Sequence, residues 1–324
     1  MLYLSRAEVE PLLEPLALVD ALATAMADLS AGHASVPPRV GALVADVGGV
    51  LGAMPGYSPA AGVLAAKLVT VFPRNTDVPS HQALIAVFDP ATGTPLAVMD
   101  GQAITAARTA AGSALSIRLL AREDTHVLAV LGTGVQARSH ALAATAVRTF
   151  TEVRIAGRDH GKAARLADQL AATGLPARAA GSWQAAVDGA DVVCATTSSD
   201  DPVVRRAELG GGVHVTSVGS APAGREVDDA TVAEALVVVE DRRTVGEPWP
   251  AGTGDVREPL ERGLLAPADL VEIGELVSGA HPGRTSPEQL TLYKSVGLAV
   301  QDAAAAGVVL AAARDQGLGR ELNL

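Results

Sequence analysis

The chain has 324 residues, 48% of them hydrophobic and 19% charged, which is typical of a globular protein with a sizeable core. Its formal charge of −11 at pH 7 is spread along the sequence, so nothing favours nucleic acid or an anionic membrane as a partner. No apolar run is long enough to span a membrane, and acidic residues follow the N-terminus where a signal peptide would be apolar. We therefore expect a cytoplasmic protein.

The N-terminal third of the sequence predicts a helix followed by antiparallel strands. Ser5 and Glu8 have the spacing of a capping box, and an Ala/Leu-rich helix is predicted over residues 16–29. Beyond it, alternating apolar residues and turn signals predict strands over residues 50–57, 62–72, 81–88 and 95–99. A helix of small residues is then expected to lead the chain to a nucleotide-binding strand.

Two basic residues lie in unusual surroundings within these elements. Lys67 interrupts a strand of Ala, Leu and Val, where it either reaches the sheet edge or points into a pocket. Arg108 lies among small residues, as either a solvated surface charge or a carboxylate ligand. The local pattern leaves both alternatives open.

A strand, a glycine-rich turn and a helix predict a dinucleotide-binding βαβ unit. The strand covers residues 126–131, and a second strand covers Glu152–Ala156. Between them Gly132 allows a tight turn, Gly134 lets the backbone approach phosphate oxygens, and Ala137 permits close packing of helix on strand. The helix N-terminus would bind the pyrophosphate.

The residues after the second strand choose between the two nicotinamide cofactors. Arg158 suits a ribose 2′-phosphate, whereas Asp159 would suit a ribose 2′-hydroxyl if the turn were shifted by one residue. We expect NADPH to be preferred, with NADH as the alternative.

The remaining sequence alternates strands and helices, which predicts an α/β protein with a Rossmann-type doubly wound sheet. The loops after its strands would lie at the edge of the sheet where ligands bind. Residues 241–262 are rich in Gly, Pro and charge and are predicted to form a long surface connection. Strands are expected over residues 191–196, 213–219, 236–240 and 291–297, and helices over residues 162–172, 182–187 and 298–314 and from about residue 228.

Metal and hydrolase chemistry have no support in the sequence. The seven His residues are scattered, and the single cysteine, Cys194, lies in an apolar run that predicts a core position, so no metal site is expected. A Ser-His-Asp hydrolase would need a GxSxG elbow, which the chain lacks.

Motifs along nearly the whole chain resemble the ornithine cyclodeaminase/mu-crystallin family. They are Gly52-Ala-Met-Pro-Gly-Tyr57, Lys67-Leu-Val-Thr-Val-Phe72, Pro79-Ser-His-Gln82, Leu96-Ala-Val-Met-Asp-Gly101, Ile104-Thr-Ala-Ala-Arg-Thr109, Gly132-Thr-Gly-Val-Gln-Ala137 and Lys294-Ser-Val-Gly297. The resemblance implies an α+β substrate-binding and dimerisation domain made from both chain ends, here residues 1–116 and 299–324. Residues 117–298 would form the dinucleotide-binding Rossmann domain, and the molecule would be a homodimer.

The resemblance also implies roles for individual residues. Arg39, Lys67 and Arg108 match the basic residues that hold a substrate carboxylate beside the nicotinamide, and Lys67 could also protonate an imine. Together, the glycine-rich turn, the strand-end loops and the resemblance give the expected dinucleotide-binding residues. These are Gly132, Gly134, Val135, Gln136, Ala137, Arg158, Thr109, Ser80, His81, Gln82, Thr196, Val218, Ser295 and Gly297.

One departure from the family pattern selects the activity. Cyclodeaminases resembling this chain carry an Asp at the position of Ala221, and alanine has no proton to exchange, so cyclodeaminase activity is not expected. The following segment, Arg225-Glu-Val-Asp-Asp229, resembles the ketimine reductase branch. We expect NAD(P)H-dependent reduction of a cyclic ketimine carboxylate, either pyrroline-2-carboxylate or piperideine-2-carboxylate. The alternatives are alanine dehydrogenase-like or opine-like reductive amination of an oxo acid, and non-catalytic binding of NADPH and a small acid.

Overall fold

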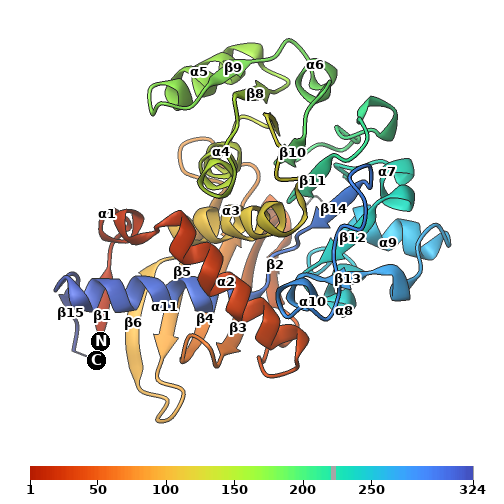
Figure 1. The fold of residues 1–324 in the computed structure, drawn as a ribbon. Coiled ribbons are helices and arrows are strands. Elements are labelled where there is room, and N and C mark those ends of the chain that lie inside the picture. Colours follow the sequence, from red (N-terminus) through yellow and green to blue (C-terminus); the bar gives the residue numbers. More distant parts are fainter. Residues whose placement is uncertain (220–223, 324) are drawn as a thin grey trace. The chain divides into compact units, whose positions relative to one another are not determined.

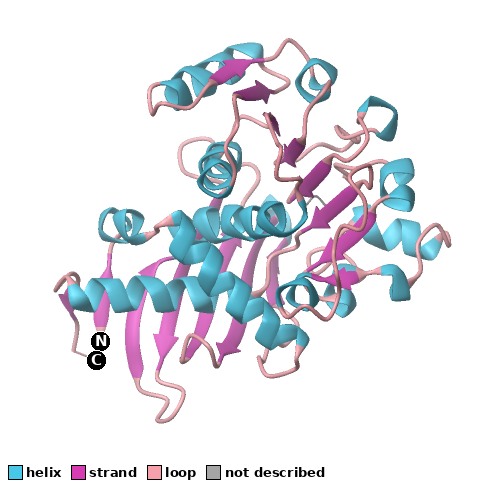
Figure 2. Ribbon diagram, in the orientation of Figure 1, coloured by secondary structure: helices cyan, strands magenta, loops and turns pink. Residues whose placement is uncertain are grey.

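The computed structural model describes residues 1–219 and 224–323, which fold into two compact units (Figures 1 and 2). Unit 1 contains Met1–Arg108 and Gly297–Leu324, and unit 2 contains Thr109–Val296. The chain passes from the first to the second within helix α3, Gly101–Leu120. Ala221 lies outside the described residues. Over residues 1–219 and 224–323, no helix combines the length and apolarity needed to cross a bilayer.

Unit 1 is built on a mainly antiparallel sheet with the strand order β15-β1-β6-β5-β4-β3-β2 among the described residues. Its strands are β1 (Leu2–Leu4), β2 (Val40–Val44), β3 (Gly49–Ser58), β4 (Val63–Val71), β5 (His81–Phe88), β6 (Pro95–Asp100) and β15 (Arg320–Glu321). The antiparallel pairing of β3 with β4 and of β5 with β6 confirms the strands expected from the alternating pattern.

Two helices of unit 1, α2 (Pro15–Ser30) and α11 (Ala299–Asp315), pack on each other, and α11 lies on β3 and β4 (Figure 1). A glycine in β3 allows the close contact between α11 and the sheet. A Cβ at Gly56 would lie 2.9 Å from the Cβ of Ala299, so any side chain there would push the helix off the sheet.

The predicted capping box is confirmed, because Glu8 Oε2 accepts hydrogen bonds from Ser5 N and Oγ. It starts the short helix α1 (Arg6–Val9), which continues into the 3-10 turn η1 (Glu10–Leu12).

Unit 2 is a doubly wound sheet in which every strand pairing given for the described residues is parallel, as the alternating pattern predicted. Its strand order is β13-β12-β14-β11-β10-β7-β8-β9. The order reverses between β7 and β10, which is the switch point where such sheets bind ligands. The strands are β7 (Val127–Leu131), β8 (Glu152–Ala156), β9 (Ala177–Ala179), β10 (Val192–Ala195), β11 (His214–Ser217), β12 (Leu236–Val239), β13 (Val271–Glu272) and β14 (Thr291–Lys294).

The segment predicted as a long surface connection, residues 241–262, is instead partly helical and partly buried. It contains helices α8 and α9, and Val245, Asp255 and Val256 are buried. The prediction was wrong because polar residues of this segment stabilise packed structure: Asp241 and Gly246 cap α8, and the buried Asp255 pairs with Lys294. The helices of unit 2 beyond α3 are α4 (Val135–Val147), α5 (His160–Ala171), α6 (Trp183–Val187), α7 (Asp229–Glu234), α8 (Arg242–Val245), α9 (Gly254–Glu261) and α10 (Ile273–Val277).

Candidate functional site

The alternation of strand β4 directs Lys67 to the buried face of the sheet in unit 1. Along this strand Val63, Ala65 and Lys67 are buried, whereas Leu64 and Leu68 are exposed on the opposite face. Lys67 is only 2% exposed. Lys67 therefore points inward and does not reach the solvent at the sheet edge, while the other alternative, a lysine pointing into a substrate pocket, stays a prediction.

Asp302 joins two of the three predicted substrate-binding residues. Its Oδ2 atom lies 2.7 Å from Lys67 Nζ, and its Oδ1 accepts a hydrogen bond of 2.9 Å from Arg108 Nε. Arg108 also donates to Gln301 Oε1 at 3.1 Å. Arg108 is 5% exposed, so it is not a surface charge. We call Arg39, Lys67, Arg108 and Asp302 the basic cluster.

Arg39 joins the cluster through Gly297. Its Nη2 donates a 2.7 Å hydrogen bond to the carbonyl oxygen of Gly297. A Cβ at Gly297, whose φ is +72°, would lie 2.7 Å from Arg108 Nη1. Glycine is therefore required there both for the left-handed backbone and for the arginine that lies against it. The structure thus places Gly297, predicted as a dinucleotide contact, beside the basic cluster.

Burial and charge compete over the protonation of Lys67. Burial and the neighbouring Arg108 and Arg39 lower the pKa of Lys67, whereas Asp302 raises it, and the result is a pKa of about 8. For Asp302 burial raises the pKa, but Arg108 and Lys67 outweigh it and hold the pKa below its ordinary value. A lysine whose pKa is near neutrality can both attract a carboxylate and give up a proton.

The segment predicted to approach the dinucleotide from unit 1 begins strand β5. Burial lowers the pKa of His81, and Lys67 and Arg108 lower it further. The carbonyl of His81 accepts a hydrogen bond from Gln102 Nε2 at 2.7 Å, while Ser80 and Gln82 are exposed. His81 is therefore the member of this segment that the basic cluster influences.

Sequence reasoning missed Asp302 and Gln301. The signal was present, because Gln301 and Asp302 are the only polar residues from Ala299 to Ala313 in an Ala/Val-rich helix. Both are 1% exposed. Two adjacent polar residues in an otherwise apolar helix require buried partners. Those partners are about 190 residues away in the sequence, so the pairing itself could not be read from it.

Unit 2 places the predicted glycine-rich turn at the switch point of its sheet. Gly132 has φ +133°, and a Cβ there would lie 2.4 Å from Thr196 Oγ1. Thr196 in turn donates from Oγ1 to Leu131 O at 2.9 Å. Gly134 is the N-cap of α4, and a Cβ there would meet no atom within 4 Å. The backbone at Gly134 is thus open at the start of a helix, which fits a dinucleotide pyrophosphate.

The first turn of α4 contains the other predicted residues of this motif. Ala137 is fully buried against the sheet, and Val135 is 65% exposed. Gln136 Oε1 is buried without a hydrogen-bond partner among the described residues. Because buried polar atoms are usually paired, this acceptor fits a ligand donor at the site. These residues would hold the cofactor. Thr109, which was also predicted to bind the dinucleotide, is buried on α3.

The end of strand β8 separates the two residues that bear on the cofactor choice. Arg158 is exposed at this edge of the sheet. Asp159 is the N-cap of α5, and its Oδ1 accepts from Lys162 N at 3.0 Å. This backbone hydrogen bond lowers the pKa of Asp159. The carboxylate is therefore already used to cap a helix.

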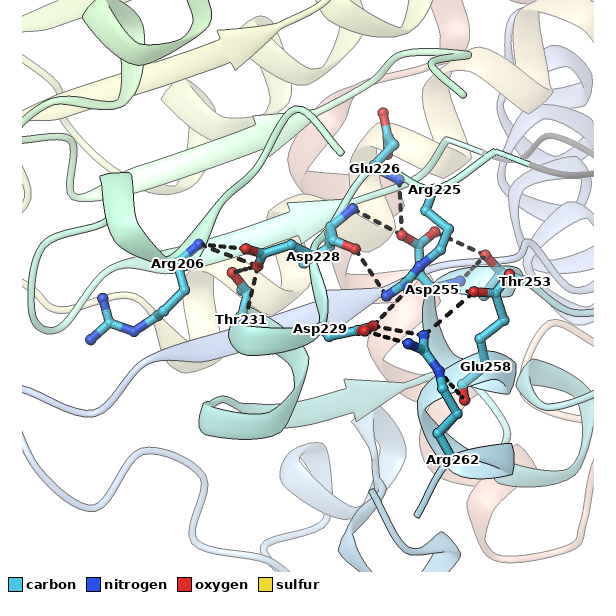
Figure 3. A network of polar contacts seen from close by, with 11 residues as sticks. Arg206, Arg225, Glu226, Asp228, Asp229, Thr231, Thr253, Asp255, Glu258 and Arg262 are labelled. Atoms are coloured by element: carbon cyan, nitrogen blue, oxygen red, sulfur yellow. Dashed lines mark hydrogen bonds and ion pairs between the residues drawn. The ribbon is translucent and has the colours of Figure 1, made fainter. Parts of the chain in front are cut away.

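Buried carboxylates hold the strand-end loops of unit 2 in place. Glu226, 2% exposed, accepts hydrogen bonds from Thr197 Oγ1, Ser217 Oγ and Gly219 N. Asp255 accepts from the backbone N–H of Glu226, as Figure 3 shows, and pairs with Lys294 Nζ at 2.8 Å. Glu226 thus holds the backbone of Gly219, shortly after the end of β11.

Two further residues predicted to contact the dinucleotide also lie at the ends of strands. Val218 donates from its backbone N–H to Ala195 O at 3.1 Å, continuing the pairing of β11 with β10. Ser295 Oγ donates to Glu240 Oε1 at 2.7 Å. Its hydroxyl thus has a partner within the protein.

Histidines near these loops belong to the core. His140 Nε2 lies 2.9 Å from Ser113 Oγ, and burial lowers its pKa to about 4. His214 Nδ1 lies 2.8 Å from Thr291 Oγ1, and burial lowers its pKa to about 3. Cys194 is buried, which raises its pKa to about 12. These groups are neutral structural residues.

The chain is similar to known reductases and dehydrogenases over its whole length. The ketimine reductase mu-crystallin of Mus musculus is 39% identical over 315 residues, which cover 95% of this chain and 96% of the relative. Among solved structures, Thermococcus litoralis Delta(1)-pyrroline-2-carboxylate reductase in complex with NADH and L-proline is 32% identical, with a TM-score of 0.93 and coverage of 99% and 100%. An archaeal alanine dehydrogenase dimer with bound NAD is 30% identical, with a TM-score of 0.92 and coverage of 100% and 99%. The model of the ornithine cyclodeaminase/mu-crystallin family matches residues 1–317, so the chain belongs to that family.

Proposed function

We propose that the protein uses NAD(P)H to reduce a cyclic ketimine carboxylate, such as pyrroline-2-carboxylate or piperideine-2-carboxylate, to the cyclic amino acid. The observation that carries this proposal is the basic cluster, in which the buried Lys67 and Arg108 pair with the Asp302 carboxylate and Arg39 is held beside them by Gly297. Its formal charge is positive before a substrate binds, which suits an anionic carboxylate ligand. Similarity to a ketimine reductase and to a pyrroline-2-carboxylate reductase supports the same substrate class.

In this reaction the basic cluster binds and protonates the substrate. Arg39 and Arg108 hold the planar carboxylate, which fixes the adjacent imine carbon. Lys67 Nζ donates a proton to the imine nitrogen, and the lysine is then reprotonated from solvent. The bound dinucleotide supplies the hydride, so the imine carbon gains the hydride and the nitrogen gains the proton.

We assign substrate binding to unit 1 and dinucleotide binding to unit 2, with NADPH preferred. Gly132 and Gly134 support the second assignment because their backbone suits a pyrophosphate at a helix N-terminus. The unpartnered Gln136 Oε1 supports it separately, as an acceptor for a donor group elsewhere on the ligand. The preference for NADPH is supported by Arg158, which is exposed at the strand end, while Asp159 already caps α5. A cytoplasmic location remains a prediction.

We further propose that unit 1 forms a homodimer through the face of its sheet opposite to α11. Leu68 and Leu84 lie directly opposite each other on β4 and β5 and are 38% and 42% exposed. Leu51 and Leu64 add to this apolar surface on β3 and β4. Apolar patches on a sheet face are typical of protein interfaces. The similar alanine dehydrogenase structure is described as a dimer.

The second candidate function is reductive amination of an oxo acid, which the similarity to an alanine dehydrogenase favours. The same basic cluster would bind the oxo acid carboxylate. The test follows NADPH and NADH oxidation by absorbance with piperideine-2-carboxylate, pyrroline-2-carboxylate, and pyruvate with and without ammonia. Turnover of an imine without ammonia is expected. Activity only with oxo acid plus amine would move the protein to the dehydrogenase class, and silence throughout would contradict both reactions and favour a binding role.

A further inference from the structure

We propose that Asp302 is a positioning residue of the reductase, because it aims the Lys67 ammonium and the Arg108 guanidinium and keeps Lys67 charged until the substrate accepts a proton. The inference rests on the proposed function for the proton transfer. The control that Asp302 exerts on Lys67 follows from the geometry of unit 1 alone.

The two carboxylate oxygens of Asp302 contact different basic side chains. Oδ2 lies 2.7 Å from Lys67 Nζ, and Oδ1 accepts from Arg108 Nε at 2.9 Å. One carboxylate thus fixes two groups that come from different elements, β4 and α3. A neutral amide in its place could still accept from one partner, but it would remove the negative charge that both cations face.

The carboxylate is itself held rigidly by helix α11. Asp302 lies in the first turn, where the preceding residue, Gln301, accepts from Leu298 N at 3.0 Å and from Arg108 Nη1 at 3.1 Å. The helix rests directly on β3, where Gly56 contacts Ala299. The contact of α11 with β3 and the hydrogen bonds of Gln301 therefore hold the start of this helix, and with it the Asp302 carboxylate, in place.

Charge explains why this carboxylate is needed. The charged or titratable groups that act on Lys67 are Asp302 on α11, Arg108 on α3, Arg39 ahead of β2 and His81 on β5. Burial and both arginines favour the neutral amine, and Asp302 alone among them favours the ammonium. Without Asp302 the lysine would lose its proton at a lower pH and could not deliver it to an imine nitrogen near neutrality.

The composition of the chain allows a direct measurement, because Lys67, Lys162 and Lys294 are its only lysines. With lysine labelled with carbon-13 at Cε, NMR should give one signal for each, and the signal missing in Lys67→Arg identifies Lys67. Asp302→Asn should lower the titration midpoint of Lys67 by about one to three pH units. The other two signals should stay in place.

A matched control exists in unit 2, where Asp255 lies 2.8 Å from the buried Lys294. Asp255→Asn should move the Lys294 signal and leave that of Lys67 unchanged. A Lys67 midpoint that does not move in folded Asp302→Asn overturns the proposal. If that variant does not fold, Asp302→Glu decides: it keeps the charge, so the midpoint should stay near 8, but its extra methylene should lower kcat by about tenfold or more. An unchanged kcat in Asp302→Glu would remove the positioning role.

The pH profile links the inference to the reaction. In Asp302→Asn the alkaline limb of kcat/KM for imine reduction should move to lower pH by the same amount as the NMR midpoint. A moved midpoint with an unmoved limb would overturn the role of Asp302 in proton delivery. If the unmodified enzyme reduces no imine while Asp302→Asn still moves the midpoint, the proposed function fails and the control of Lys67 by Asp302 stands.

Discussion

Replacing the first two glycines of the nucleotide turn with alanine should separate folding from cofactor binding. Gly132→Ala puts a Cβ on a residue with φ +133° and within 2.4 Å of Thr196 Oγ1. The backbone strain and the overpacking together should lower the free energy of unfolding by about 2 to 6 kcal/mol. Gly134→Ala meets no atom within 4 Å, so its free energy of unfolding should change by less than about 0.5 kcal/mol.

For cofactor binding, in contrast to stability, the larger effect is expected from Gly134→Ala. The added methyl at residue 134 would occupy the space through which phosphate oxygens approach the backbone, so Gly134→Ala should weaken NADPH binding by about tenfold or more, or about 1.4 kcal/mol. Urea unfolding followed by circular dichroism and calorimetric titration with NADPH measure the two quantities.

Gly181→Ala, which also has open space around its Cβ, should change neither quantity. Unaltered NADPH affinity in Gly134→Ala would refute a pyrophosphate at this helix N-terminus. A stability loss below about 0.5 kcal/mol in Gly132→Ala would refute the steric argument.

Four further predictions test the other parts of the proposal. Lys67→Ala should lose most reductase activity and retain NADPH affinity, and unchanged turnover would remove Lys67 from the mechanism. Arg158→Ala should weaken NADPH but not NADH, whereas equal losses would exclude a 2′-phosphate contact. Leu68→Glu should convert the proposed dimer to a monomer in analytical ultracentrifugation, and the exposed Leu16 on α2 provides a control, since Leu16→Glu should leave assembly intact. Because burial lowers the pKa of His140 to about 4 from 6.5, the unfolded state takes up a proton first on acidification. The free energy of unfolding should therefore fall from about pH 6.5 to 4, with a shallower slope in His140→Gln.

Local patterns predicted most of the elements because each is specified by its own residues. The period of two in β4 and the Gly132 turn before α4 are examples, and the structure contains both. Residues 241–262 were mispredicted because a composition of Gly, Pro and charge describes loops and capped helices equally well. Asp255 shows the difference: it is a buried partner of Lys294, which lies far along the chain.

The candidate site was predicted only in part, because its side-chain contacts join residues that are far apart in the sequence. The resemblance pointed to Lys67 and Arg108, but only the fold shows that both are buried and share a carboxylate. The direction of Lys67 within its strand could not be decided from β4 alone. It depends on which face α11 covers, and that is a tertiary contact.

Two adjacent residues of strand β4 have opposite surroundings. Lys67 pairs with the buried Asp302, and Leu68 is exposed on the other face of the sheet. A slip of one residue in the pairing of β4 would exchange them, placing an apolar side chain against a buried carboxylate and an ammonium on the proposed dimer surface. Both errors would cost free energy of folding. The register of β4 is therefore fixed by each of its two faces, through Lys67 on one and Leu68 on the other. Insertions or deletions in the Pro59–Gly62 turn between β3 and β4 should therefore be tolerated far less than changes of residue type there.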